Sequence, residues 1–197
     1  MARDMVPVLK RCRSLGLDPI YLGVDKKSNR QSIRGNKKKS EYGLQLTEKQ
    51  KAKFIYGVLE KPFRNYFEKA ERMKGQTGEN LMMLLELRLD NVMFRMGYGR
   101  TRKESRQIVG HKHVTVNGNT VTIPSYRVKP GDVIEIKEKY KTSQRYKDIL
   151  EVTEARIVPE WLEANHEALS GTVKELPKRE QIDVPVNEML IVELYSK

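Results

Sequence analysis

Cations and histidines crowd one short stretch of the chain, and their types suit the binding of phosphate groups. Guanidinium and ammonium groups bind phosphate oxygens, and imidazole rings stack on bases or bond to phosphates. Glu104 is almost the only acidic residue among them. A merely solvated helix face is the alternative interpretation, but so short a segment does not need so many cations for solubility. The candidate contacts to nucleic acid in this stretch are Arg100, Arg102, Lys103, Arg106, Gln107, His111, Lys112 and His113.

Further candidates for phosphate contact lie outside this stretch. The run Lys37, Lys38 and Lys39 is predicted to be exposed, with a flexible charged loop as the alternative. Tyr42 is a candidate too, although a place in the core or at its edge is the preferred interpretation for this tyrosine. The remaining candidates are Arg3, Lys10, Arg11, Arg34, Lys51 and Arg95.

Groupings that could perform catalysis are missing from the sequence. It contains no phosphate-binding glycine loop, no nucleophile elbow and no paired-histidine zinc motif. Asp90 is predicted to pair with a neighbouring cation. His111 and His113 lack a third metal ligand at useful spacing, and Cys12, the only cysteine, excludes an intramolecular disulfide and a cysteine-based zinc site. We expect no catalytic residue, no metal and no cofactor.

The charge of this 197-residue chain is +12 and is unevenly distributed. Residues 1–45 carry 11 Lys or Arg against 4 Asp or Glu, and residues 88–147 carry 14 against 5. Residues 46–87 are nearly neutral, with 8 against 6, and residues 148–197 are acidic, with 5 against 11. Two basic blocks predict two surfaces for a polyanionic partner such as RNA. The acidic quarter is expected to face the protein's own basic side or, by slight preference, a basic protein neighbour.

A membrane location does not fit the hydropathy pattern. The most apolar stretch, residues 81–96, is interrupted by Glu86, Arg88, Asp90 and Arg95. The first 13 residues mix charges with few apolar side chains, unlike a secretory signal. We therefore expect a cytoplasmic protein with no membrane partner and no small-molecule substrate.

The first half of the chain is predicted to be mainly helical. Residues 1–43 predict short turns and loops, and Thr47 with Gln50 predicts a capping box that begins a helix. The helical pattern continues past Pro62 to Gly75. A second helix is expected from Thr77 to Gly97.

The second half mixes helices and strands, and the fold class is therefore α+β. Thr101 and Glu104 predict a helix that ends at Gly110, with Arg102 and Arg106 exposed on one side of it. Asn117-Gly118 predicts a tight hairpin. The hairpin strands are expected over 113–116 and 119–123, a further strand over 133–137, a connector or short helix over 138–150, a helix over 160–168 and a final strand over 189–195.

Several ordered motifs resemble the ribosomal protein S4 family of the small subunit, in its bacterial form. The resemblance extends over essentially the whole chain. The motifs are Tyr42-Gly43-Leu44-Gln45-Leu46, Ile55-Tyr56-Gly57-Val58-Leu59-Glu60, Gly75-Gln76-Thr77-Gly78-Glu79-Asn80-Leu81, Arg88-Leu89-Asp90-Asn91-Val92, Phe94-Arg95-Met96-Gly97, Val116-Asn117-Gly118 and the terminal Leu190-Ile191-Val192-Glu193-Leu194-Tyr195-Ser196-Lys197.

The resemblance implies a helical N-terminal domain, residues 1–87 completed by 181–197, with an RNA-binding domain of a helix-helix-hairpin unit and a small, mainly antiparallel sheet inserted at 88–180. It also implies direct, early binding to small-subunit ribosomal RNA at a junction in the five-prime domain. The resemblance further implies contacts with neighbouring small-subunit proteins and a place at the channel through which messenger RNA enters the subunit. Contributions to decoding accuracy and repression of the family's own operon are also implied. Unlike members that hold zinc with four cysteines, this chain has only Cys12.

Two other functions remain open on the sequence alone. An RNA-modifying enzyme such as a pseudouridine synthase can carry the same small RNA-binding unit, but only about 86 residues precede the unit here, too few for a large catalytic domain. A messenger-binding repressor would present the same chemistry, because structured messenger and ribosomal RNA offer the same phosphate geometry.

Overall fold

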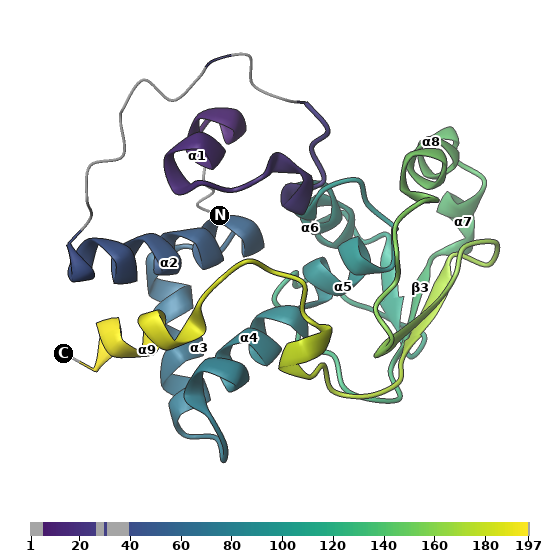
Figure 1. The fold of residues 1–197 in the computed structure, drawn as a ribbon. Helices are drawn as coiled ribbons and strands as arrows, with labels where there is room; N and C mark the ends of the chain where they lie inside the picture. The colour runs from purple at the N-terminus through teal and green to yellow at the C-terminus, as the bar shows by residue number, and fades with distance from the viewer. Residues whose placement is uncertain (1–5, 27–29, 31–39, 197) are drawn as a thin grey trace. The chain divides into compact units, whose positions relative to one another are not determined.

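The computed structural model describes residues 6–26, 30 and 40–196 (Figure 1). The described chain forms two compact units, one from residues up to Met82 together with those from Asp183 onward, and one from Met83–Ile182. The first is helical, and the second combines helices with an antiparallel sheet. The expected α+β class is confirmed. None of the helices within the described ranges has the length and apolarity needed to cross a membrane.

The first unit consists of helices that bury one face each. Its elements are α1 (Val8–Leu15), the 3-10 helix η1 (Pro19–Leu22), α2 (Glu41–Tyr56), α3 (Glu60–Glu71), the first part of α4 (Thr77–Glu86) and α9 (Glu188–Tyr195). Cys12 is buried, as expected for a small apolar thiol. Gly57 ends α2 with a φ of +62°, a left-handed conformation that glycine adopts without strain.

The start of α2 differs from the prediction. Ser40, not Thr47, caps the helix, because its hydroxyl accepts a hydrogen bond from the Gly43 amide at 3.2 Å. Thr47 lies inside α2, where its hydroxyl donates to the Gly43 carbonyl at 2.7 Å. A threonine inside a helix can donate a hydrogen bond to a carbonyl of the preceding turn. The sequence pattern of a capping box is therefore present here although Thr47 does not cap the helix.

The C-terminal segment is the helix α9, and the predicted strand over 189–195 is wrong. Asn187 caps the helix by accepting a hydrogen bond from the Met189 amide at 3.1 Å. Tyr195 stacks on Phe67, with 4.5 Å between ring centroids, and its hydroxyl donates to Glu60 at 3.1 Å. A short apolar run has no reliable period, so its partners within the first unit decide its conformation.

The predicted helix over 77–97 is divided into α4 and α5 (Leu89–Arg95). Between them the backbone pairs with the segment 124–128 instead of continuing as a helix. The Val128 amide donates to the Leu87 carbonyl at 3.0 Å, and the Leu89 amide donates to the Tyr126 carbonyl at 2.9 Å. The apolar stripe runs through the break unchanged, which is why the sequence did not reveal it.

In the second unit, α5 and α6 (Arg102–Gly110) lie against each other and share one hydrophobic core with the sheet (Figure 1). Among the described residues the sheet has five strands in the order β2-β1-β3-β5-β4, all antiparallel. Trp161 and Tyr98 are fully buried in this core. The remaining elements are β1 (Val114–Val116), β2 (Asn119–Thr120), β3 (Val133–Ile136), α7 (Glu138–Lys141), α8 (Gln144–Thr153), β4 (Leu162–Asn165), β5 (Ser170–Val173) and the 3-10 helix η2 (Arg179–Gln181).

The predicted hairpin is confirmed. Asn117 and Gly118 both have positive φ, +49° and +77°, as a two-residue turn of this kind requires. The Asn117 side chain accepts from the Val133 amide and donates to Asp132, both at 2.9 Å, and so ties the turn to β3. The second strand is shorter than expected, because it ends at Thr120.

The helix predicted over 160–168 is wrong, because residues 162–165 form β4. This strand pairs with β5, with Leu162 opposite Val173 and Asn165 opposite Ser170. Leu169, in the connecting turn, has a φ of +48°. Pairing with β5 extends the sheet, a long-range contact that outweighs the local helical preference of this segment.

Candidate RNA-binding surface

The helix α6 carries most of the predicted cationic residues. Its first turn is held as expected, because the Thr101 hydroxyl accepts a hydrogen bond from the Glu104 amide at 3.1 Å. The Glu104 carboxylate does not return to Thr101 but accepts from the Arg100 amide at 2.9 Å. The short helix is therefore fixed at its start by two reciprocal bonds, one residue out of register with a standard capping box.

A buried polar network lies beneath α6 and links it to α4 and α5. Arg95 donates to both carboxylate oxygens of Glu86, at 3.0 and 2.8 Å. Asn91 donates to the same carboxylate at 2.7 Å and accepts from Arg102 at 2.7 Å. Glu86 is completely buried, so these bonds replace the water that its charge has lost.

A second buried cluster centres on Asp90, as predicted for this carboxylate. Arg88 donates to its two oxygens at 3.1 and 2.6 Å. Arg106 adds a bond to one of them at 3.2 Å. Asp90 is only 4% exposed and forms ion pairs with two arginines. Its carboxylate therefore has a structural role and does not act as a nucleophile.

Phe94 lies between two guanidinium groups, those of Arg102 and Arg156, each 4.2 Å from the ring centroid. Arg156 also donates to the carbonyls of Phe94, Gly99 and Arg100 at 2.8 to 2.9 Å. It thereby fixes the loop between α5 and α6. Sequence reasoning did not predict this role, because Arg156 belongs to no motif or cationic cluster.

Two predicted contact residues are not on the surface. Arg102 is 7% exposed and Arg95 is 8% exposed, and both guanidinium groups are bound by protein partners. The expectation that Arg102 points outward with Arg106 is wrong for Arg102. Spacing along a helix showed that these side chains share a side, but it did not show that α5 covers part of that side.

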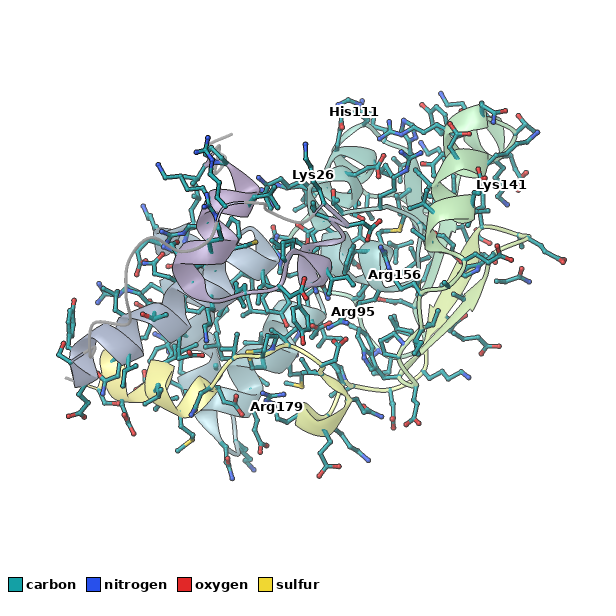
Figure 2. The ribbon with its side chains drawn as sticks, turned by 45° about the horizontal axis from the view of Figure 1, so that its top comes forward. Lys26, Arg95, His111, Lys141, Arg156 and Arg179 are labelled. Atoms are coloured by element: carbon teal, nitrogen blue, oxygen red, sulfur yellow. The ribbon has the colours of Figure 1, made fainter. Side chains whose placement is uncertain are left out.

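The remaining candidates from this stretch form an accessible cationic surface. Lys103, Gln107, His111 and Lys112 are exposed, and Arg100, Arg106 and His113 are half-buried. Figure 2 shows His111 projecting from the second unit, whereas Arg156 lies among other side chains. The helix thus has an inner face of arginines that hold the fold and an outer face that is open to a ligand.

In the first unit, Lys10 is exposed at α1, and Tyr42 is 58% exposed in the first turn of α2. Tyr42 is therefore not a core residue. Arg11 donates to Gln50 at 3.0 Å, and Lys51 pairs with Glu48 at 2.6 Å. The other candidates lie outside the described residues; they are Arg3, Arg34, Lys37, Lys38 and Lys39.

Replacing Arg102 with alanine is expected to lower the free energy of unfolding by about 2–3 kcal/mol, because it removes a charged hydrogen bond to Asn91 and the contact with Phe94. Lys103→Ala, one residue along the same helix but exposed, is expected to lower it by less than about 0.5 kcal/mol. Urea unfolding followed by circular dichroism measures both. Equal stability of the two variants would show that the inner face is not structural.

Two family models together match most of the chain. Residues 87–134 match the family described as "S4 domain", and residues 4–86 match "Ribosomal protein S4/S9 N-terminal domain". The S4 domain match begins at the break between α4 and α5 and includes α5, α6, the hairpin and the start of β3.

Relatives resemble the chain over its full length. It is 76% identical to small ribosomal subunit protein uS4 of Lachnoclostridium phytofermentans and 73% identical to that of Agathobacter rectalis, with complete coverage of both chains in each case. A more distant uS4, from Hahella chejuensis, is 50% identical, again with complete coverage. These relatives are ribosomal proteins and not RNA-modifying enzymes, and the chain belongs to the uS4 family of small ribosomal subunit proteins.

Proposed function

We propose that this protein binds small-subunit ribosomal RNA directly, as an early assembly protein that holds a helix junction of the five-prime domain. The observation that carries the proposal is the division of α6 into two faces. Its arginines Arg102 and Arg106 donate to Asn91 and Asp90, and Asn91 donates in turn to Glu86. Lys103 and Gln107 stay exposed on the outer face. A cationic surface held rigid by buried bonds can receive phosphates without first being ordered.

Residues 88–180 act in this proposal as the inserted RNA-binding domain, and residues 1–87 with 181–197 as the domain into which it is inserted. The basic block in residues 1–45 supplies a second RNA surface, to which the exposed Lys10 and Tyr42 belong. Two basic surfaces on one chain allow it to hold more than one RNA helix of a junction.

A comparison of two transcripts tests the proposal. The purified protein should retain a five-prime-domain transcript of small-subunit ribosomal RNA on a filter at concentrations where an equally long transcript of another ribosomal domain is not retained. Co-sedimentation with small subunits in a gradient is the corresponding result for the assembled particle. Equal binding of the two transcripts would contradict a specific role at the junction.

We also propose that Lys37, Lys38 and Lys39 contribute to the channel through which messenger enters the subunit. Replacing all three by alanine is expected to leave junction binding largely intact but to slow translation of messengers that contain hairpins. A reconstituted translation system measures the rate on structured and unstructured messengers. If the variant is no slower on the structured messenger than the parent protein, these lysines do not have this role.

The acidic quarter supports a contact with a basic protein neighbour in the subunit. Its carboxylates are largely exposed and face few cations of their own, which suits a cationic partner and not phosphate. The exposed acidic residues are Glu151, Glu154, Glu160, Glu163, Glu167, Glu175, Glu180, Asp183 and Glu193.

A further inference from the structure

Three elements of the second unit meet at the imidazole of His113. The ring stacks on Tyr140 of α7, with 3.7 Å between centroids and 4° between planes. Its Nδ1 lies 3.0 Å from the hydroxyl of Tyr146 in α8. The His111 ring, from the loop after α6, is centred 6.4 Å away. The stack and the hydrogen bond hold His113 in one orientation at the meeting point of α6, α7 and α8.

Basic side chains lie around this ring, from the loop after α6, from α7 and the residue before it, and from α8. The charged and titratable groups that act on His113 are Arg145, His111, Lys139 and Lys137. Lys139 lies 4.7 Å from the centroid of the Tyr140 ring, and the Lys137 amide donates to the His113 carbonyl at 2.9 Å. Two carboxylates offset part of this charge, because Glu104 pairs with Arg145 and Glu138 pairs with Lys141. Neither Lys137 nor Lys139 pairs with a carboxylate among the described residues.

The positive charge around His113 affects the pKa of its imidazole. Burial lowers the pKa of His113 from its ordinary value of 6.5, and the neighbouring basic side chains, Arg145 above all, lower it further. A site at which positive charges repel one another gains most from an anion, which relieves the repulsion and accepts hydrogen bonds from several donors at once. In Figure 2, nitrogen-tipped side chains gather between the labelled His111 and Lys141.

We propose that a backbone phosphate of RNA binds at these residues, which we call the His113 shelf, and that His113 takes up a proton when it does. The shelf consists of His111, Lys112, His113, Lys137, Lys139 and Arg145. This inference rests on the proposed RNA-binding function. It extends that function, because the S4 domain match ends at residue 134 and Lys137, Lys139 and Arg145 lie beyond it. The RNA surface therefore continues from α6 onto α7 and α8.

The expected pH dependence follows from the sign of this coupling. A phosphate beside His113 favours the charged imidazolium and raises its pKa in the complex. In the free protein, the pKa of His113 lies below its ordinary value of 6.5. RNA affinity should therefore rise as the pH falls from the pKa of the complex to that of the free protein, and should level off below the latter. Burial raises the pKa of Tyr146, so its hydroxyl stays neutral throughout. A separate variant of each histidine separates their contributions.

The test uses the full chain and a five-prime-domain transcript, with filter binding at constant salt between about pH 5.5 and about pH 8. The parent protein should bind more tightly as the pH falls, and His113→Gln should reduce this slope more than His111→Gln does. Lys137→Gln with Lys139→Gln should weaken binding roughly tenfold. Lys137→Arg with Lys139→Arg should restore it, because the charge is kept.

Lys147→Gln is the matched control for charge. Lys147 is exposed on α8 but two residues from Arg145, and thus on the opposite side of the helix. Its loss should change affinity by less than about twofold. Thermal melting of each variant within a few degrees of the parent excludes unfolding as the cause.

The outcomes separate this inference from the proposed function. If the parent protein does not bind the transcript, the proposed function fails and the shelf with it. If the parent binds but the double glutamine variant matches Lys147→Gln, and His113→Gln keeps the parent's slope, only the shelf is wrong.

Discussion

Replacing Glu86 with alanine is expected to lower the free energy of unfolding by about 3–5 kcal/mol. The substitution leaves Arg95 without both oxygens that it binds, at 3.0 and 2.8 Å, in a site where the arginine is 8% exposed. Asn91 loses the acceptor of its 2.7 Å bond at the same time. An uncompensated buried charge is among the few single changes able to unfold a marginal domain.

Chemical denaturation of the two variants Glu86→Ala and Glu68→Ala measures this effect. Glu68 pairs with Arg64 at 3.3 Å on the exposed side of α3, so its loss should change stability by less than about 1 kcal/mol. The double change Glu86→Leu with Arg95→Met should recover much of the lost stability, since no unpaired charge remains. A Glu86→Ala variant as stable as Glu68→Ala would mean that the network is hydrated and not buried.

Binding to small-subunit ribosomal RNA is expected to weaken about a thousandfold or more between about 50 and 200 mM salt, if roughly six to ten phosphates are contacted. The reason is release of counterions by the two basic blocks, residues 1–45 and 88–147. Filter binding at several salt concentrations gives the slope of affinity against salt.

The same slope distinguishes contact residues from structural ones. Lys103→Ala should reduce it by about one phosphate contact, and variants on the exposed face of α3, such as Lys69→Ala, should leave it unchanged. A response to salt that is nearly flat for the parent protein would show that recognition does not depend on phosphate charge.

The sequence predicted the elements whose signals are local. Thr101 before α6 and Asn117-Gly118 in the hairpin act through bonds within a few residues, and both are confirmed. The errors occurred where distant partners decide the conformation. α9 is a helix because of its contacts in the first unit, and β4 is a strand because β5 lies beside it.

For the candidate site, the sequence predicts which residue types are present but not which of them are exposed. Composition and spacing singled out the segment 100–113, but they do not separate an arginine that contacts a ligand from one that contacts a buried carboxylate. Arg102 and Lys103 are adjacent in the sequence, yet one is buried and the other exposed. That distinction depends on Asn91 and Phe94, which contact Arg102 from another helix.

The segment between β2 and β3 has almost no regular secondary structure, but it is joined to the helical core by main-chain bonds. Val128 donates to Leu87, the amides of Leu89 and Asp90 donate to the carbonyls of Tyr126 and Pro124, and the adjoining Gly131 amide donates to Val173. This stretch therefore cannot open without breaking bonds to α5 and β5. It belongs to the same cooperative unfolding unit as the helix pair, and its amide protons should exchange with solvent as slowly as those of a core element.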